Sequence, residues 1–103
     1  LNGTPTVVYE EGFYLAAASQ LLARVRRVEA NVRHIMIVGH DPGMHGLAVD
    51  LAGSGTPKQM QALAAKFPTA GLAVLDFEVD EWSKIEPGLG QLRLFMTPKL
   101  LAD

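Results

Sequence analysis

The residues Gly39-His40-Asp41-Pro42-Gly43 have the types and spacing that most suggest chemistry. They follow an apolar run, and ligands in open α/β sheets bind beyond the carboxyl ends of parallel strands. The helix expected from Pro42 directs backbone N–H groups and the positive end of its dipole to the same place, which favours a phosphate or carboxylate. His40 is therefore the candidate catalytic and phosphate-binding side chain, with Gly39 and Gly43 beside it. A histidine that only ends the strand and bonds to backbone is the structural alternative.

The other two histidines fit different roles. His34 begins the apolar run instead of ending it, so it belongs at the opposite edge of the sheet. His45 lies five residues after His40, which is not the i,i+4 spacing that puts two metal ligands on one helix face. We expect His45 to be an exposed helical residue. No grouping of His, Cys or carboxylates predicts a metal site, and no cofactor is expected.

Several other polar and aromatic residues carry weaker signals. Glu10 and Glu11 could return to the crevice and supply a general acid, although solvated surface carboxylates are the simpler interpretation. Trp82 is expected to anchor the core or an interface. Neither a nucleophile elbow nor a P-loop is present. A group of basic side chains on the first helix is expected to face solvent: Arg24, Arg26 and Arg27.

Hydrophobic periodicity predicts the elements that position these residues. Apolar residues at helical spacing predict an amphipathic helix over about 17–30, and the uninterrupted apolar run 35–38 predicts a buried parallel strand. Helical spacing returns at Pro42, with Asp41 as the N-cap and Gly53 as a left-handed stop.

The second half of the chain predicts a short helix followed by two strands. Thr56 caps a helix that begins at Pro57 and ends by 67–68. Period-two alternation over 73–79 and 91–96 then predicts an antiparallel pair, the later strand placing Leu92, Leu94 and Met96 on one face. This order of elements predicts a three-layer α/β/α sandwich with a mixed, mostly parallel sheet.

Composition limits the class of protein. The 103 residues carry a formal charge of −2, are 49% hydrophobic and contain no cysteine. A single domain, or part of one, follows from that length. The absence of a basic excess argues against nucleic acid as a partner, and no apolar run approaches the roughly 20 residues that cross a bilayer. The absence of cysteine fits a reducing compartment, so the cytoplasm is the expected location.

The run Ile35 to Gly43 resembles the second-histidine motif of the histidine phosphatase superfamily, in particular its small phosphohistidine phosphatase (SixA-like) branch. Further segments are similar and follow in the same order: 12–16, 67–71 and 92–98. The resemblance covers most of the chain and implies a phosphoglycerate-mutase-like fold. It also implies that one histidine attacks phosphorus, while two arginines and His40 hold the phosphoryl oxygens. His40 would not be the nucleophile.

The sequence departs from this family in one respect. The Arg-His-Gly motif that carries the nucleophile is absent from residues 1–103, as is the helix start that carries the second arginine. We therefore expect the C-terminal portion of one domain, incomplete at its N-terminus, with an unpaired sheet edge and no activity alone.

The expected activity is hydrolysis of phosphohistidine in a protein. An imidazole leaving group departs with little help, whereas an alkoxide needs a proton donor, and no convincing acid is present. A phosphatase or mutase acting on small phosphate esters is one alternative. A domain without catalysis that senses phosphate or binds a protein is the other.

Overall fold

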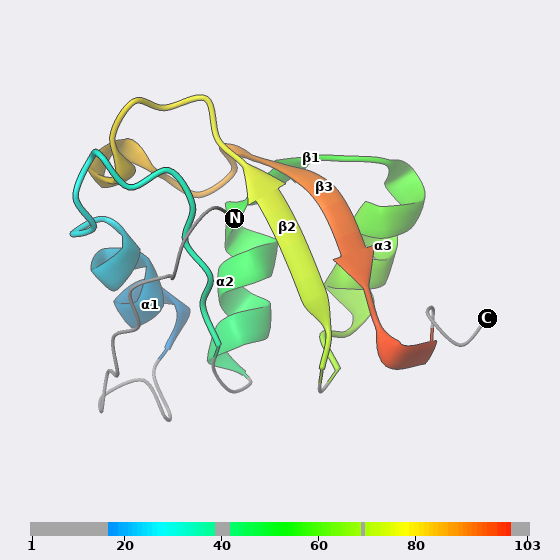
Figure 1. The fold of residues 1–103 in the computed structure, drawn as a ribbon. Helices are drawn as coiled ribbons and strands as arrows, with labels where there is room; N and C mark the ends of the chain where they lie inside the picture. The colour runs from blue at the N-terminus through cyan, green and yellow to red at the C-terminus, as the bar shows by residue number, and fades with distance from the viewer. Residues whose placement is uncertain (1–16, 39–41, 69, 100–103) are drawn as a thin grey trace.

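The computed structural model describes residues 17–38, 42–68 and 70–99, which form a small α/β fold (Figure 1). The α/β fold class predicted from the sequence is therefore confirmed. In chain order the elements are α1 (Ala18–Val25), α2 (Gly43–Leu51), β1 (Ala52–Ser54), α3 (Pro57–Ala65), β2 (Leu72–Asp76), the 3-10 turn η2 (Trp82–Lys84) and β3 (Gly90–Met96). None of the described helices is long and apolar enough to cross a bilayer.

The strands form one mixed sheet in the order β1-β3-β2. β3 pairs antiparallel with β2, which confirms the pairing predicted for the last two strands. β3 also pairs in parallel with β1, a three-residue strand that the sequence pattern did not reveal. The described sheet thus has one parallel and one antiparallel pair, so the expectation of a mostly parallel sheet is not met within it.

A bulge in β3 changes which of its side chains face the core. Between Leu92 and Leu94 the register against β2 slips, which leaves Arg93 as the extra residue. One extra residue reverses the alternation of a strand beyond it. Leu92 and Phe95 are consequently buried at 4% and 2% exposure, whereas Leu94 is only half-buried. The predicted face of Leu92, Leu94 and Met96 is wrong for this reason.

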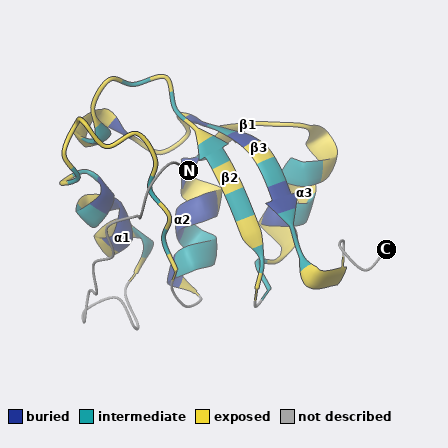
Figure 2. Cartoon of the chain, in the orientation of Figure 1, coloured by how far each residue is buried: buried dark blue, intermediate teal, exposed yellow. Residues whose placement is uncertain are grey.

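Among the described helices, α2 and α3 lie against the sheet, while α1 packs beside α2 (Figure 2), and buried side chains form two cores. Burial of these apolar side chains is the main favourable term in folding. The first core joins α1, α2 and the end of the η2 turn through Leu21, Leu22, Val25, Leu47, Leu51 and Ile85. The second joins α2, α3 and β3 through Ala48, Leu63, Leu92 and Phe95.

α1 is shorter than the predicted helix over 17–30. The helix ends at Val25. Beyond it, N–H groups bond to the carbonyl three residues earlier instead of four, as Arg27 N–H does to the Arg24 carbonyl at 3.1 Å. Such bonds close a last turn and let the chain leave the helix direction. Arg26 then donates from Nε to the Ile85 carbonyl at 2.7 Å. The turn is therefore fixed by the η2 region, a contact that periodicity cannot predict.

The run Ile35 to Val38 is extended but pairs with no described strand, so the predicted buried parallel strand is corrected. Ile35 and Ile37 pack against the first core. Met36 and Val38, in contrast, are 78% and 84% exposed. A strand buried on both faces needs paired neighbours and two covering layers, and the described residues supply helices on one side only.

α2 begins at Gly43 with Pro42 in the cap position, one residue later than predicted. The expected cap, Asp41, lies outside the described residues. At its other end α2 passes directly into β1, so Gly53 is a strand residue and not a left-handed stop. A Cβ at Gly53 would lie 1.8 Å from the Gly88 carbonyl oxygen, so close backbone approach explains this glycine.

α3 forms as the sequence predicts. The Thr56 hydroxyl accepts a hydrogen bond from the Gln59 N–H at 3.3 Å, and Pro57 occupies the first turn. The helix ends at Ala65, before Phe67 and Pro68.

Candidate functional site

The described part of the candidate site is the start of α2. Gly43 is its first residue and is buried, while Pro42 before it is exposed. The other two members of the predicted site, Gly39 and His40, lie outside the described residues. In the sequence His40 stands two residues after Val38 and three before Gly43, between the extended segment and α2.

The first turn of α2 suits an anion. Gly46 is the first residue whose N–H bonds within this helix, to the Pro42 carbonyl at 3.0 Å. The preceding N–H groups of the turn must find partners outside the helix, and they lie at its positive end. The residues from Gly43 to Gly46 include no carboxylate that would repel an anion.

His45 is not the exposed helical residue that the sequence predicts. Its side chain is half-buried, and Nε2 donates to the Leu63 carbonyl at 2.6 Å. That carbonyl belongs to the last turn of α3, where carbonyls lack partners within the helix. The ring also lies 6.4 Å from that of Phe67. His45 therefore positions α3 against α2, a role that no local sequence signal reveals.

His34 is exposed and lies in the extended segment upstream of the apolar run, at the end away from α2. Nearby, the Trp82 indole N–H donates to the Val32 carbonyl at 2.6 Å. Trp82 also packs against the first core, so the expectation of a core anchor is confirmed. This bond ties the beginning of the extended segment to the η2 turn.

Of the remaining sequence candidates, the structure describes the three arginines, which lie at and just after the end of α1. Glu10 and Glu11, the possible general acids, lie outside the described residues. Arg27 is exposed as predicted, but Arg26 is partly buried by its bond to Ile85, so the expectation that it faces solvent is wrong. Among the residues that the structure describes, no group of three or more His, Cys, Asp and Glu could hold a metal ion.

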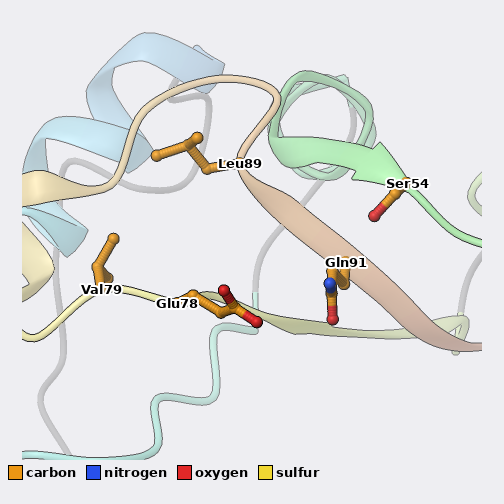
Figure 3. A pocket seen from close by; sticks show the side chains of 5 residues that line it. All are labelled: Ser54, Glu78, Val79, Leu89 and Gln91. Carbon is orange, nitrogen blue, oxygen red and sulfur yellow. The ribbon is translucent and has the colours of Figure 1, made fainter.

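A small pocket of about 300 Å³ was missed by sequence reasoning (Figure 3). Its lining includes the polar side chains of Ser54, Glu78 and Gln91. The pocket lies at the C-terminal end of α2. Gly90, which precedes the lining residue Gln91, is so close to this end of the helix that a Cβ on it would lie 2.7 Å from the Leu51 carbonyl oxygen. The nine residues of α2 separate this pocket from Gly43 by about 13 Å. A carboxylate among its polar groups makes the pocket a poor phosphate site.

One ion pair with shifted pKa values lies on the surface between β2 and η2. Lys84 Nζ donates to the Asp80 carboxylate at 2.9 Å, and this hydrogen bond with the adjacent charge lowers the pKa of Asp80. The same contact raises the pKa of Lys84. Both groups are exposed and belong to neither the pocket nor the start of α2, so the pair is an ordinary surface ion pair.

Relatives of the chain occur in mycobacteria. An uncharacterized protein of Mycobacterium tuberculosis, found in two strains, is 38% identical over 93 residues, which is 88% of this chain and 58% of the relative. An uncharacterized protein of Mycobacterium leprae is 32% identical over 94 residues, 90% of this chain and again 58% of the relative. The chain thus spans well under two thirds of these relatives. No family model and no solved structure matches it.

Proposed function

We propose that the natural protein is a phosphatase that hydrolyses phosphohistidine in proteins, with His40 as its second, phosphate-binding histidine. The geometry at the start of α2 is the observation that most supports this proposal. Gly43 is the buried first residue of the helix, and His40 precedes it by three residues. An imidazole and the N–H groups of Gly39 and Gly43 could thus act on one phosphoryl group.

Covalent catalysis would proceed in two steps. A histidine outside these 103 residues attacks phosphorus, the P–N bond to the substrate imidazole breaks, and that imidazole takes up a proton. Water then attacks the phosphorylated enzyme and releases phosphate. His40, by donating a hydrogen bond to a phosphoryl oxygen, would stabilise the charge that is present in both transition states.

Phosphohistidine is favoured over phosphate esters because the described site offers no proton donor for an alkoxide. The first turn of α2 contains no acidic residue, and Glu78 in the pocket lies at the other end of that helix. An imidazole leaves without strong acid catalysis.

We further propose that residues 1–103 are the C-terminal portion of one three-layer α/β/α domain that acts in the cytoplasm. A phosphorylated protein would be its substrate, with neither nucleic acid nor a membrane as partner. The near-neutral charge and the absence of cysteine support this placement.

The test uses the intact natural protein with His40→Ala, and His34→Ala as a matched control at an exposed histidine. Turnover is measured on a phosphohistidine protein and on a small phosphate ester in parallel. Loss of about a hundredfold or more in kcat/KM for His40→Ala alone supports the proposal. Wild-type turnover by His40→Ala overturns it. Hydrolysis confined to the ester would assign the alternative activity, and no hydrolysis of either substrate would favour a binding domain.

A further inference from the structure

The pocket beside β1 and β3 has no role in the proposed phosphatase activity. Its volume is about 300 Å³, and it is lined by Ser54, Glu78, Val79, Leu89 and Gln91 (Figure 3). These residues come from β1, from the chain that follows β2 and from the chain around the start of β3. The volume is at the lower end of the range for small-molecule pockets, so one side chain or a ligand of similar size would fill it.

The strand register places the polar side chains of the pocket on one face of the sheet. Ser54 of β1 and Gln91 of β3 are register partners, so their side chains point to the same face. Leu92 is buried on the helix side, and Gln91 before it therefore points to the other face. Glu78 likewise precedes Val79, which packs against the first core. A carboxylate, a hydroxyl and an amide thus surround one space (Figure 3).

The Glu78 carboxylate carries a charge that no described side chain neutralises. Within the part of the chain that the structure describes, this side chain takes part in no salt bridge or hydrogen bond. The basic side chains on the neighbouring segments bond elsewhere. Arg93 donates to the Asp76 carboxylate at 2.8 Å, and Lys84 donates to the Asp80 carboxylate at 2.9 Å. The negative charge of the pocket is therefore left for a ligand.

Backbone contacts hold the walls of the pocket in place. The Gly88 N–H donates to the Asp50 carbonyl at 2.8 Å, which fixes the loop just before Leu89. A Cβ at Gly53 would lie 1.8 Å from the Gly88 carbonyl oxygen, so the backbone before Ser54 lies directly against the same loop. A site whose groups are already positioned loses less conformational entropy when it binds a ligand.

We infer that this pocket binds an organic cation, a guanidinium or ammonium group on a short aliphatic chain. Such groups only donate hydrogen bonds, and Glu78, Ser54 and Gln91 offer oxygen atoms that accept them. Val79 and Leu89 supply apolar surface for the methylene groups of the chain. The inference does not rest on phosphatase activity, because the pocket and the proposed phosphate site lie at opposite ends of α2.

The first test follows the amide NMR signals of the intact natural protein as butylguanidinium is added, with butylurea as a neutral ligand of the same shape. We expect saturable shifts at Ser54, Glu78 and Gln91 with butylguanidinium. Butylurea should bind about tenfold more weakly or worse, since hydrogen bonds between charged groups are the stronger ones. Equal binding of butylurea, or no saturable shift at these residues, overturns the inference.

The second test removes the charge of the pocket with Glu78→Gln. Glu29→Gln is the matched control, at an exposed glutamate after α1 that does not line the pocket. Both positions are exposed, so both variants should fold. We expect Glu78→Gln to raise the Kd for butylguanidinium about tenfold or more and Glu29→Gln to leave it unchanged. An unchanged Kd in Glu78→Gln, or an equal increase in both variants, overturns the inference.

The source of the cation is identified with N-acetyl-arginine methylamide, which presents the side chain as a protein does. If this probe binds as tightly as butylguanidinium, the inference is supported with the side chain of a protein as the ligand. If butylguanidinium binds and the blocked arginine does not, the inference is supported with a free cation as the ligand. Failure of both probes to bind overturns it, and leaves the proposed phosphate site untouched.

Discussion

Two segments for which the sequence predicts strands, 35–38 and 91–96, differ in how they are paired and buried in this molecule. The run in β3 is paired on both sides and places Leu92 and Phe95 against α2 and α3. The run Ile35 to Val38 is extended but pairs with no described strand, and every second side chain is exposed. The difference shows that an apolar pattern specifies an extended segment, whereas its burial depends on neighbours that lie elsewhere in the chain.

The largest effect should come from the paired run. Phe95→Ala removes a ring that is 2% exposed and lies 5.7 Å from the ring of Phe67, so we expect a loss of about 3–5 kcal/mol in the free energy of unfolding. Leu94→Ala, on the next residue, should cost less than half as much because the bulge turns Leu94 away from the core. Denaturant unfolding measures both. Equal losses would show that the bulge is absent.

Close backbone approach is a second feature of the paired part of the sheet, at Gly53 in β1. Gly53→Ala would place a methyl group 1.8 Å from the Gly88 carbonyl oxygen, and we expect a cost of about 1–3 kcal/mol as β1 shifts. Gly46→Ala is the control: among the described residues its Cβ would meet the Ala18 side chain, at 3.2 Å, and a gain of about 1 kcal/mol in helix propensity offsets that contact. Thermal unfolding of the two variants should therefore differ. A neutral Gly53→Ala would contradict the described β1–β3 pairing.

The histidines offer a third comparison between a packed and an open region. His45→Ala leaves the Leu63 carbonyl without its donor, so we expect a loss of about 1 kcal/mol. His34→Ala, in the open segment, should change the unfolding free energy by less than about 0.5 kcal/mol. If both variants unfold like the wild type, the bond between α2 and α3 contributes nothing.

The smallest effect is expected on the surface. Lys84→Gln removes the hydrogen bond and charge that lower the pKa of Asp80, so this pKa should return toward its ordinary value in a carboxyl NMR titration. A lowered carboxyl pKa stabilises the fold above the unfolded-state pKa, and this contribution is lost as pH falls through the folded-state value. The raised pKa of Lys84 matters at alkaline pH. Its contribution to stability is lost as the pH rises through the folded-state pKa of Lys84. An unchanged Asp80 titration would show that the pair does not form in solution.

Local signals were sufficient where the deciding contacts are local. Thr56 and Pro57 fix the start of α3 within a few residues, and alternation alone locates β2 and β3. The bulge at Arg93 was not predictable, because a strand's alternation says nothing of a slip against its partner.

Long-range contacts explain the other differences between sequence and structure. The partners of Arg26 and His45 lie 59 and 18 residues away, which no periodicity encodes. β1 is three residues long and contains a glycine, so it carries almost no strand pattern. For the candidate site, the sequence located the helix start within one residue, and Gly43 is the predicted member that the structure describes.

The proposed role of His40 and the start of α2 in holding a phosphoryl group can be tested by titrating the intact natural protein with inorganic phosphate, followed by amide NMR. We expect saturable shifts at Gly39, His40 and Gly43, abolished by His40→Ala and kept in His34→Ala. No saturable shift there, or shifts confined to the pocket of Ser54, Glu78 and Gln91, would contradict it.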